Sequence, residues 1–283
     1  MLEPNVTNLH GKVALVTGSG SGIGRSIVET LAAHGASAVV VDRDAESARA
    51  VASGIEARGG EALACVVDVT TIEGVETLSA ETEQRFGGVD VLVNDVGNFM
   101  PGAGPFLKSS EADWEALYDI NFKHILRCTR AFAPSMVERG AGSIISVSTV
   151  ETLRGIPGSA VYSAFKTAIT AFTRSFALEV APSGVRVNAI APETTETAQV
   201  PVSHWVPEKY RDRIEYMIPL GRFGRPDDHA GAVLFLASEL SAWVTGVTIP
   251  VDGGAIAAGG FYRLASGRWT NTPIVSDAAI RPR

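Results

Sequence analysis

Hydrophobic positions along the chain fall into two alternating patterns. Short apolar runs are typical of buried strands, and they are separated by segments whose apolar residues recur at helical spacing. The runs predict seven strands, at residues 12–17, 36–42, 62–67, 89–94, 143–147, 185–190 and 244–251. The helical spacing predicts helices at residues 25–34, 44–58, 72–86, 111–139, 159–180 and 226–236. Strands that alternate with helices favour an α/β fold, a doubly wound parallel sheet of seven strands with helices on both faces.

Two segments depart from this alternation. Residues 193–219 follow the sixth predicted strand and contain prolines, a tryptophan, a histidine and scattered charges, so we predict that they form a lid. Residues 255–283 are expected to be an irregular C-terminal extension, although their aromatic residues argue against disorder. No composition break or linker divides the chain, and we therefore expect residues 1–283 to form a single domain.

A glycine-rich turn follows the first predicted strand and opens the first helix. Gly18, Gly22 and Gly24 would let the backbone approach a pyrophosphate, and the amide end of the helix favours negative charge. Asp42 ends the second strand, where a carboxylate can accept bonds from the ribose hydroxyls of NAD and repel the 2′-phosphate of NADP. Asp42 could instead be a simple turn residue, and the neighbouring Arg43 could hold that phosphate. The turn predicts dinucleotide binding, with NAD favoured over NADP.

Tyr162 and Lys166 lie four residues apart in the predicted helix 159–180, so their side chains share one helix face. A free phenol titrates near pH ~10, and acid-base work near neutrality needs a fall of ~3 units in its pKa, roughly 4 kcal/mol. An adjacent ammonium in a low-dielectric site can supply much of that free energy. The pair is therefore either an ordinary surface pair or an acid-base tyrosine with its cation.

Composition and charge exclude several classes of function. The formal net charge is −7 and no run of Lys or Arg forms a basic patch, so nucleic acid is a poor partner. Cys65 and Cys128 lie in apolar or helical patterns and are expected to be buried, reduced thiols. The opening residues resemble no secretory signal, no apolar stretch is long enough to cross a membrane, and the histidines lack ligand-like spacing. We expect a cytoplasmic protein with no membrane partner and no metal.

Together these motifs resemble the short-chain dehydrogenase/reductase family, and the resemblance covers residues 12–254. The matches are residues 17–24 for T-G-x-x-x-G-I-G, Asp68 for the adenine-contacting acid, 94–97 for N-N-A-G, Asn121 for the relay asparagine, 162–166 for Y-x-x-x-K and 192–197 for P-G-x-x-x-T. Asp95 and Val96 replace Asn and Ala of the third motif, and Glu193 replaces the glycine of the last. Glu193 therefore places a carboxylate near the site, unless it is simply exposed to solvent. The resemblance implies a Rossmann-like fold.

The resemblance also implies roles for individual residues. Tyr162 would move a proton, while Lys166 would lower the phenol pKa and hold the nicotinamide ribose. Asn121 would support a water relay. The family places its catalytic hydroxyl thirteen residues before the tyrosine, which selects Thr149 over Ser148 to polarise the substrate oxygen. The residues implied to bind the cofactor are Gly18, Ser21, Gly22, Ile23, Gly24, Asp42, Arg43, Asp68, Val69, Asn94, Gly97, Tyr162, Lys166, Pro192, Thr195 and Thr197.

The implied activity is hydride transfer between NAD(H) and a secondary alcohol or ketone. A medium-sized cyclic or aromatic substrate is expected, because the residues that would wall its pocket are mostly apolar, although each could equally belong to the core. They are residues 96–99, Val150, Glu151, Leu153, Ile156, Trp205, Val206, Tyr210 and Met217. Alternatives are a cis-dihydrodiol dehydrogenase that makes a catechol and a catalytically idle dinucleotide-binding regulatory protein. Family members commonly pair their two long helices, so a homotetramer is expected.

Overall fold

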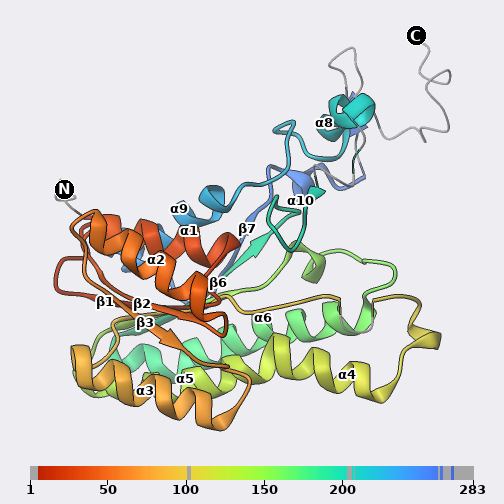
Figure 1. Ribbon diagram of the computed structural model, residues 1–283. Coiled ribbons are helices and arrows are strands. Elements are labelled where there is room, and N and C mark those ends of the chain that lie inside the picture. The colour runs from red at the N-terminus through yellow and green to blue at the C-terminus, as the bar shows by residue number, and fades with distance from the viewer. Residues whose placement is uncertain are drawn as a thin grey trace.

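Seven parallel strands form one sheet between two layers of helices in the computed structural model (Figure 1). The described residues are 6–100, 103–202, 206, 208–260, 262–263 and 269–270. The sheet has the order β3-β2-β1-β4-β5-β6-β7, which confirms the predicted doubly wound, Rossmann-like fold. Its strands are β1 (Val13–Thr17), β2 (Ser37–Asp42), β3 (Ala62–Val66), β4 (Val91–Asn94), β5 (Gly142–Val147), β6 (Val185–Pro192) and β7 (Thr248–Val251).

The helices divide between the two faces of the sheet (Figure 1). One face is covered by α1 (Gly22–Ala33), α2 (Ala45–Ala57) and α9 (Pro226–Ala237). The other face is covered by α3 (Ile72–Phe86), α5 (His124–Arg139) and α6 (Ala160–Val180). Shorter helices are α4 (Glu111–Tyr118), α8 (Ile214–Met217) and α10 (Ala255–Ala258), with 3-10 turns at Phe106–Lys108, Val150–Thr152, Ala181–Ser183, Glu208–Arg213 and Glu239–Ser241.

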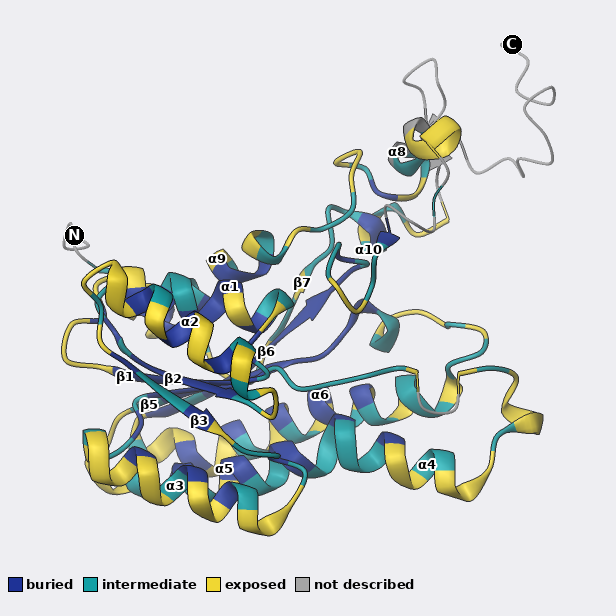
Figure 2. Ribbon diagram, viewed as in Figure 1, coloured by how far each residue is buried: buried dark blue, intermediate teal, exposed yellow. Residues whose placement is uncertain are grey.

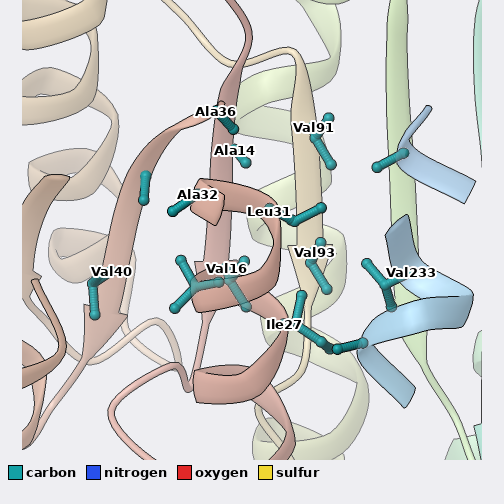
Figure 3. Packing of buried hydrophobic residues seen from close by; sticks show 14 of the residues in the cluster. Ala14, Val16, Ile27, Leu31, Ala32, Ala36, Val40, Val91, Val93 and Val233 are labelled. Carbon is teal, nitrogen blue, oxygen red and sulfur yellow. The ribbon is translucent and has the colours of Figure 1, made fainter. Parts of the chain in front are cut away.

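Alternating side chains of the strands supply two separate hydrophobic cores. On β1, Val16 belongs to the core under α1 and α9, whereas the neighbouring Leu15 belongs to the core under α3, α5 and α6. Figure 3 shows Ile27 and Leu31 of α1 pointing at the sheet, and the latter has no exposed surface. The central strands are mostly dark blue in Figure 2, since both of their faces are buried, whereas the edge strands β3 and β7 are only partly buried. Burial on both faces explains why the strand sequences are continuously apolar rather than alternating.

The segment predicted as one helix, 111–139, is interrupted by a π-helical turn at Asp119–Lys123, between α4 and α5. Residues 111–139 are therefore helical throughout, as predicted, but with a π turn that the prediction did not include. Asn121 lies inside the turn and its amide Nδ2 donates to the carbonyl oxygens of Leu117 and Asn98, at 3.0 and 2.8 Å. A π turn inserts one residue into the helical repeat and is common at functional sites. Periodicity of apolar residues alone does not reveal such an insertion.

Two other predicted segments also differ from the structure. The seventh strand was predicted from residue 244 but begins at Thr248, because Gly246 has a φ of +76° and bends the chain. The extension 255–283, predicted to be irregular, contains α10 and an antiparallel pair of β8 (Tyr262–Arg263) with β9 (Trp269–Thr270). Cys65 and Cys128 are buried free thiols, as predicted. Within the described ranges, no helix has the length and apolar character needed to cross a membrane.

Candidate active site

A cavity of about 560 Å³ lies at the carboxyl ends of the strands, where ligands bind in open α/β sheets. Its volume falls within the range of small-molecule and cofactor sites. Most of the predicted site residues line it together: Gly18, Ser21, Gly22, Ile23, Asp42, Arg43, Asp68, Val69, Gly97, Thr149, Tyr162, Lys166, Pro192, Thr195 and Thr197. Gly24, Asn94 and Asn121 do not line the cavity. The glycine turn and the Tyr162–Lys166 pair therefore line the same cavity.

The glycine turn brings the N-terminus of α1 to the cavity. Gly18 has a φ of +71°, and a Cβ there would lie 3.2 Å from Val96 Cγ2. A Cβ at Gly24 would lie 2.5 Å from the carbonyl oxygen of Gly18, so a larger residue would clash with the backbone there. Gly24 is therefore explained by packing, although it does not line the cavity. Ser21 is the N-cap residue and makes no side-chain capping bond, and the first turn of α1 has no acidic residue. The amides and the helix dipole at this end favour an anion.

Asp42 and Asp68 present carboxylates beside this helix end. The Oδ2 of Asp42 accepts from the amide of Gly20 and its Oδ1 accepts from the amide of Asp44, both at 3.0 Å. A Cβ at Gly20 would lie 2.8 Å from that Oδ2 atom, so this glycine is required too. The sequence motif did not single it out. Asp68 accepts from the amide and hydroxyl of Thr70 at 2.8 and 2.7 Å. These bonds fix both carboxylates at the cavity wall.

Lys166 is buried below the cavity and beside Tyr162. Its ammonium Nζ donates to the carbonyl oxygen of Val147 at 3.0 Å and lies 5.9 Å from the centre of the Tyr162 ring. Burial raises the pKa of Tyr162 to about 12, and the hydrogen bond with Thr149 opposes this effect. That Lys166 lowers the phenol pKa stays a prediction, since burial has the largest effect on the pKa of this phenol. Desolvation of the phenolate outweighs the hydrogen bond with Thr149, so the phenol is protonated at neutral pH.

The two candidate hydroxyls face different partners. Thr149 forms the hydrogen bond with Tyr162. Its Oγ1 also donates to the carbonyl oxygen of Pro192 at 3.5 Å and accepts from the amide of Glu151 at 3.4 Å. Ser148 Oγ instead donates to the backbone carbonyl of Lys166 at 3.0 Å and holds α6 against the end of β5. The count of thirteen residues therefore selected the hydroxyl that adjoins the phenol.

Asn121 lies behind the cavity wall. Besides the two bonds from its Nδ2, its Oδ1 accepts from the amide of Asn98 at 3.1 Å. A Cβ at Gly97 would lie 2.8 Å from Lys166 Nζ and 3.2 Å from Asn121 Oδ1, so a larger residue there would displace the Lys166 ammonium. Asn121 thus holds the backbone that forms one cavity wall. Asn94 is likewise buried outside the cavity.

The structure adds Asp95 and His124 to the groups near Lys166. Asp95 lines the cavity, and burial raises its pKa to about 7, against the opposing effects of the Lys166 ammonium and the Gly24 amide. Burial also lowers the pKa of Lys166 to about 8, which Asp95 opposes. His124 is fully buried, and desolvation lowers its pKa to about 3, so its imidazole is neutral. The sequence signal for Asp95 was its substitution in the N-N-A-G motif.

Glu193 is not exposed to solvent, contrary to the simpler of the two sequence interpretations. Only 8% of the residue is exposed, and it lines the cavity. Its Oε2 forms an ion pair with Arg154 at 2.6 Å. The loop that contains Glu193 thus carries a fixed carboxylate.

The predicted apolar wall is only partly present. Residues 96–99, Glu151 and Ile156 line the cavity, whereas Val150 is buried outside it, and Val206, Leu153, Tyr210 and Met217 are not among the lining residues. Trp205 and His204 lie outside the described residues. The predicted lid contributes residues 193–195 and 197–200 to the wall, including three threonines. Among the described residues, no group of three or more His, Cys, Asp or Glu is placed to hold a metal ion.

Known proteins resemble this chain over most of its length. A family model described as enoyl-(acyl carrier protein) reductase matches residues 18–255. The 3-oxoacyl-(acyl-carrier-protein) reductase of Thermotoga maritima is 36% identical over 248 residues, 88% of this chain and 99% of its own length. The 2,5-dichloro-2,5-cyclohexadiene-1,4-diol dehydrogenase of Sphingobium indicum is 37% identical over 246 residues, 87% and 96% of the two chains. A 7α-hydroxysteroid dehydrogenase solved with NADH and 7-oxo glycochenodeoxycholic acid superposes with a TM-score of 0.83 at 32% identity, covering 90% of this chain and 98% of that one.

Proposed function

The chain belongs to the short-chain dehydrogenase/reductase family, and on this premise we propose that it transfers hydride between NAD(H) and a secondary alcohol or ketone. Members of this family are oxidoreductases that act on alcohols and ketones. The observation that carries the proposal is the single cavity shared by the glycine turn, Thr149, Tyr162 and Lys166. A protein that only bound dinucleotide would not need a hydroxyl pair beside a buried lysine.

The acid-base step is assigned to Tyr162. With its pKa raised to about 12, its hydroxyl is protonated at neutral pH and can donate to the oxygen of a ketone as that oxygen gains charge. Thr149 adjoins the phenol, and its single hydroxyl proton, now directed at the Pro192 carbonyl, would turn to donate a second hydrogen bond to the ketone oxygen. When bound, the nicotinamide would supply or accept the hydride. In the reverse direction, Tyr162 receives the proton from the alcohol, and the buried ammonium of Lys166 favours the phenolate.

NAD is proposed as the cofactor. The α1 N-terminus provides amides for a pyrophosphate, and the fixed carboxylate of Asp42 is suited to accept bonds from ribose hydroxyls. The same carboxylate would repel a 2′-phosphate. Arg43 is exposed at the cavity edge and is the one nearby feature that favours NADP.

A medium-sized cyclic or aromatic alcohol or ketone is proposed as the substrate. Phe99, Ile156 and Val200 give the cavity an apolar part beside Tyr162, and the Phe99 ring contacts the Tyr162 ring edge-on, with centroids 6.4 Å apart. The similarity to a cyclohexadiene-1,4-diol dehydrogenase supports ring diols as a second candidate class. Cis-dihydrodiols that would be oxidised to catechols are 1,2-diols and are proposed as a further member of this class.

The test is NADH formation by the purified chain on a panel of cyclic secondary alcohols, with ketone reduction measured in reverse and NAD binding measured by calorimetry. We expect turnover with simple ring alcohols and a higher kcat/KM with NAD than with NADP. Preferential turnover of cis-diols would favour the second candidate. Tight NAD binding without turnover of any alcohol or ketone would refute the proposal and favour a dinucleotide-binding regulator.

A further inference from the structure

The loop after β6 fixes the Glu193 carboxylate in place. Its Oε1 accepts from the amide and the hydroxyl of Thr194 at 2.8 and 3.0 Å, and its side chain is only 7% exposed. The residue also lines the cavity. A carboxylate held by two donors and largely shielded from water exerts a stronger field than one at the surface.

Arg154 joins this carboxylate to a second one, that of Glu151, which also lines the cavity. Its Nη2 lies 2.6 Å from Glu193 Oε2 and 2.9 Å from Glu151 Oε1, and its Nε donates to Glu151 Oε2 at 3.3 Å. The hydrogen bonds that Arg154 donates to Glu151 have the largest effect in raising its pKa, and the negative charge of Glu193 adds to it, so Arg154 stays cationic. We call Glu151, Arg154 and Glu193 the carboxylate clamp. Two carboxylates and one guanidinium leave it with one net negative charge.

The clamp lies next to the proposed reacting groups. The Glu151 amide donates to Thr149 Oγ1 at 3.4 Å, and the hydroxyl of Ser163, next to Tyr162 in the chain, donates to the Glu151 carbonyl at 2.8 Å. The negative charge of Glu151 also contributes to the raised pKa of Tyr162. The clamp's field therefore reaches the position where the substrate oxygen would bind.

We propose that the carboxylate clamp determines substrate charge, by favouring uncharged substrates that carry hydroxyl groups and rejecting those that carry a carboxylate or phosphate. Carboxylate oxygens accept hydrogen bonds from hydroxyls, whereas a second anion in the same partly desolvated space is repelled. The inference rests on the proposed function, since it names the substrate class of the same cavity. Glu193 and Arg154 are specificity residues in it and are not assigned to the hydride transfer.

The test compares two ring ketones of the same shape, 4-oxocyclohexanecarboxylate and its carboxamide, by the ratio of their kcat/KM values. For the wild type we expect the amide to be preferred by at least about tenfold, which corresponds to about 1.4 kcal/mol. Glu193→Gln keeps the shape of the side chain and removes its charge, so the preference should fall about tenfold. Arg154→Met leaves two uncompensated carboxylates, so the preference should rise about tenfold. Glu76→Gln, an exposed change on α3, is the matched control and should leave the ratio unchanged.

The opposite directions of the two variants separate an electrostatic role from a structural one. Loss of loop structure would change the ratio in the same direction in Glu193→Gln and Arg154→Met, and that result would overturn the inference. Equal kcat/KM values for the two ketones in the wild type would overturn it as well. If neither ketone is reduced but another ring alcohol is oxidised, the pair is compared as competitive inhibitors of that alcohol, with the same expected ratios. Failure of every alcohol and ketone would instead count against the proposed function.

Discussion

Replacing Asp95 with asparagine should change how the stability of the protein depends on pH. Asp95 lines the cavity next to the Gly24 amide and the Lys166 ammonium, and burial raises its pKa from the usual value of 3.8 to about 7. A carboxyl whose pKa is higher in the folded state binds its proton more tightly there. Its contribution to stability is therefore complete below pH ~4 and is lost as the pH rises through 7.

The size of this loss follows from the two pKa values. A rise from 3.8 to about 7 corresponds to about 4 kcal/mol, spread over the interval between them. Asp95 is partly open to the cavity, where water screens its charge, so we expect about half of that figure. Lys166 has a pKa of about 8, so it stays largely charged below pH 7 and contributes little to the change there. Between pH 5 and pH 7 the wild type should therefore lose at least about 1 kcal/mol relative to Asp95→Asn.

Urea unfolding of the wild type and Asp95→Asn at half-unit steps from pH 5 to pH 7 measures this difference. Asp119→Asn is the matched control, because it removes a carboxylate that is 45% exposed and paired with Lys123 on the surface. We expect the free energies of unfolding of wild type and Asp95→Asn to diverge as the pH rises, in favour of the variant. Parallel curves for the two proteins would refute the claim that the cavity holds a carboxyl with a raised pKa.

Three further predictions concern the catalytic hydroxyl, the cofactor and the core. Thr149→Ala should lower kcat by about 100-fold or more, as expected for a lost donor to a developing oxyanion, whereas Ser148→Ala should have a much smaller effect; the reverse order in steady-state assays would show that Ser148 is the donor. Asp42→Asn should shift the NAD-to-NADP ratio of kcat/KM by about tenfold or more toward NADP, and an unchanged ratio would show that Asp42 only holds the turn. Leu31→Ala should lower the free energy of unfolding in urea by about 2–5 kcal/mol, because Leu31 is completely buried between α1 and the sheet, and a loss below about 1 kcal/mol would contradict that packing.

The architecture was predictable because the central strands are buried on both faces and their sequences are largely apolar. The grouping of the glycine turn, Asp42, Tyr162 and Lys166 was also predictable, because the carboxyl ends of parallel strands meet at one sheet edge. The tetramer and the cytoplasmic location stay predictions, since a single chain tests neither.

The details that sequence reasoning missed depend on neighbours distant in the chain. Asn121 in the π turn forms hydrogen bonds with the backbone of Asn98, which lies in the loop after β4. The raised pKa of Tyr162 reflects how far the fold excludes water, and spacing to Lys166 carries no such information. The sequence showed Glu193 only as a substitution in a motif. Its burial and its ion pair depend on Arg154, which lies in the loop between β5 and α6. Motifs thus located the site, while its electrostatics required the fold.

The central claim, that Tyr162 is the acid-base group of a hydride transfer in this cavity, is tested most directly by Tyr162→Phe. The change removes only the hydroxyl and leaves the ring in contact with Phe99. Turnover of the best ring alcohol with NAD should fall about 10²–10⁴-fold, the usual contribution of general acid-base catalysis, while the Kd for NAD changes little. Tyr118→Phe, which removes a phenol hydroxyl outside the cavity, should keep wild-type turnover. Turnover by Tyr162→Phe within about threefold of the wild type would contradict the assignment.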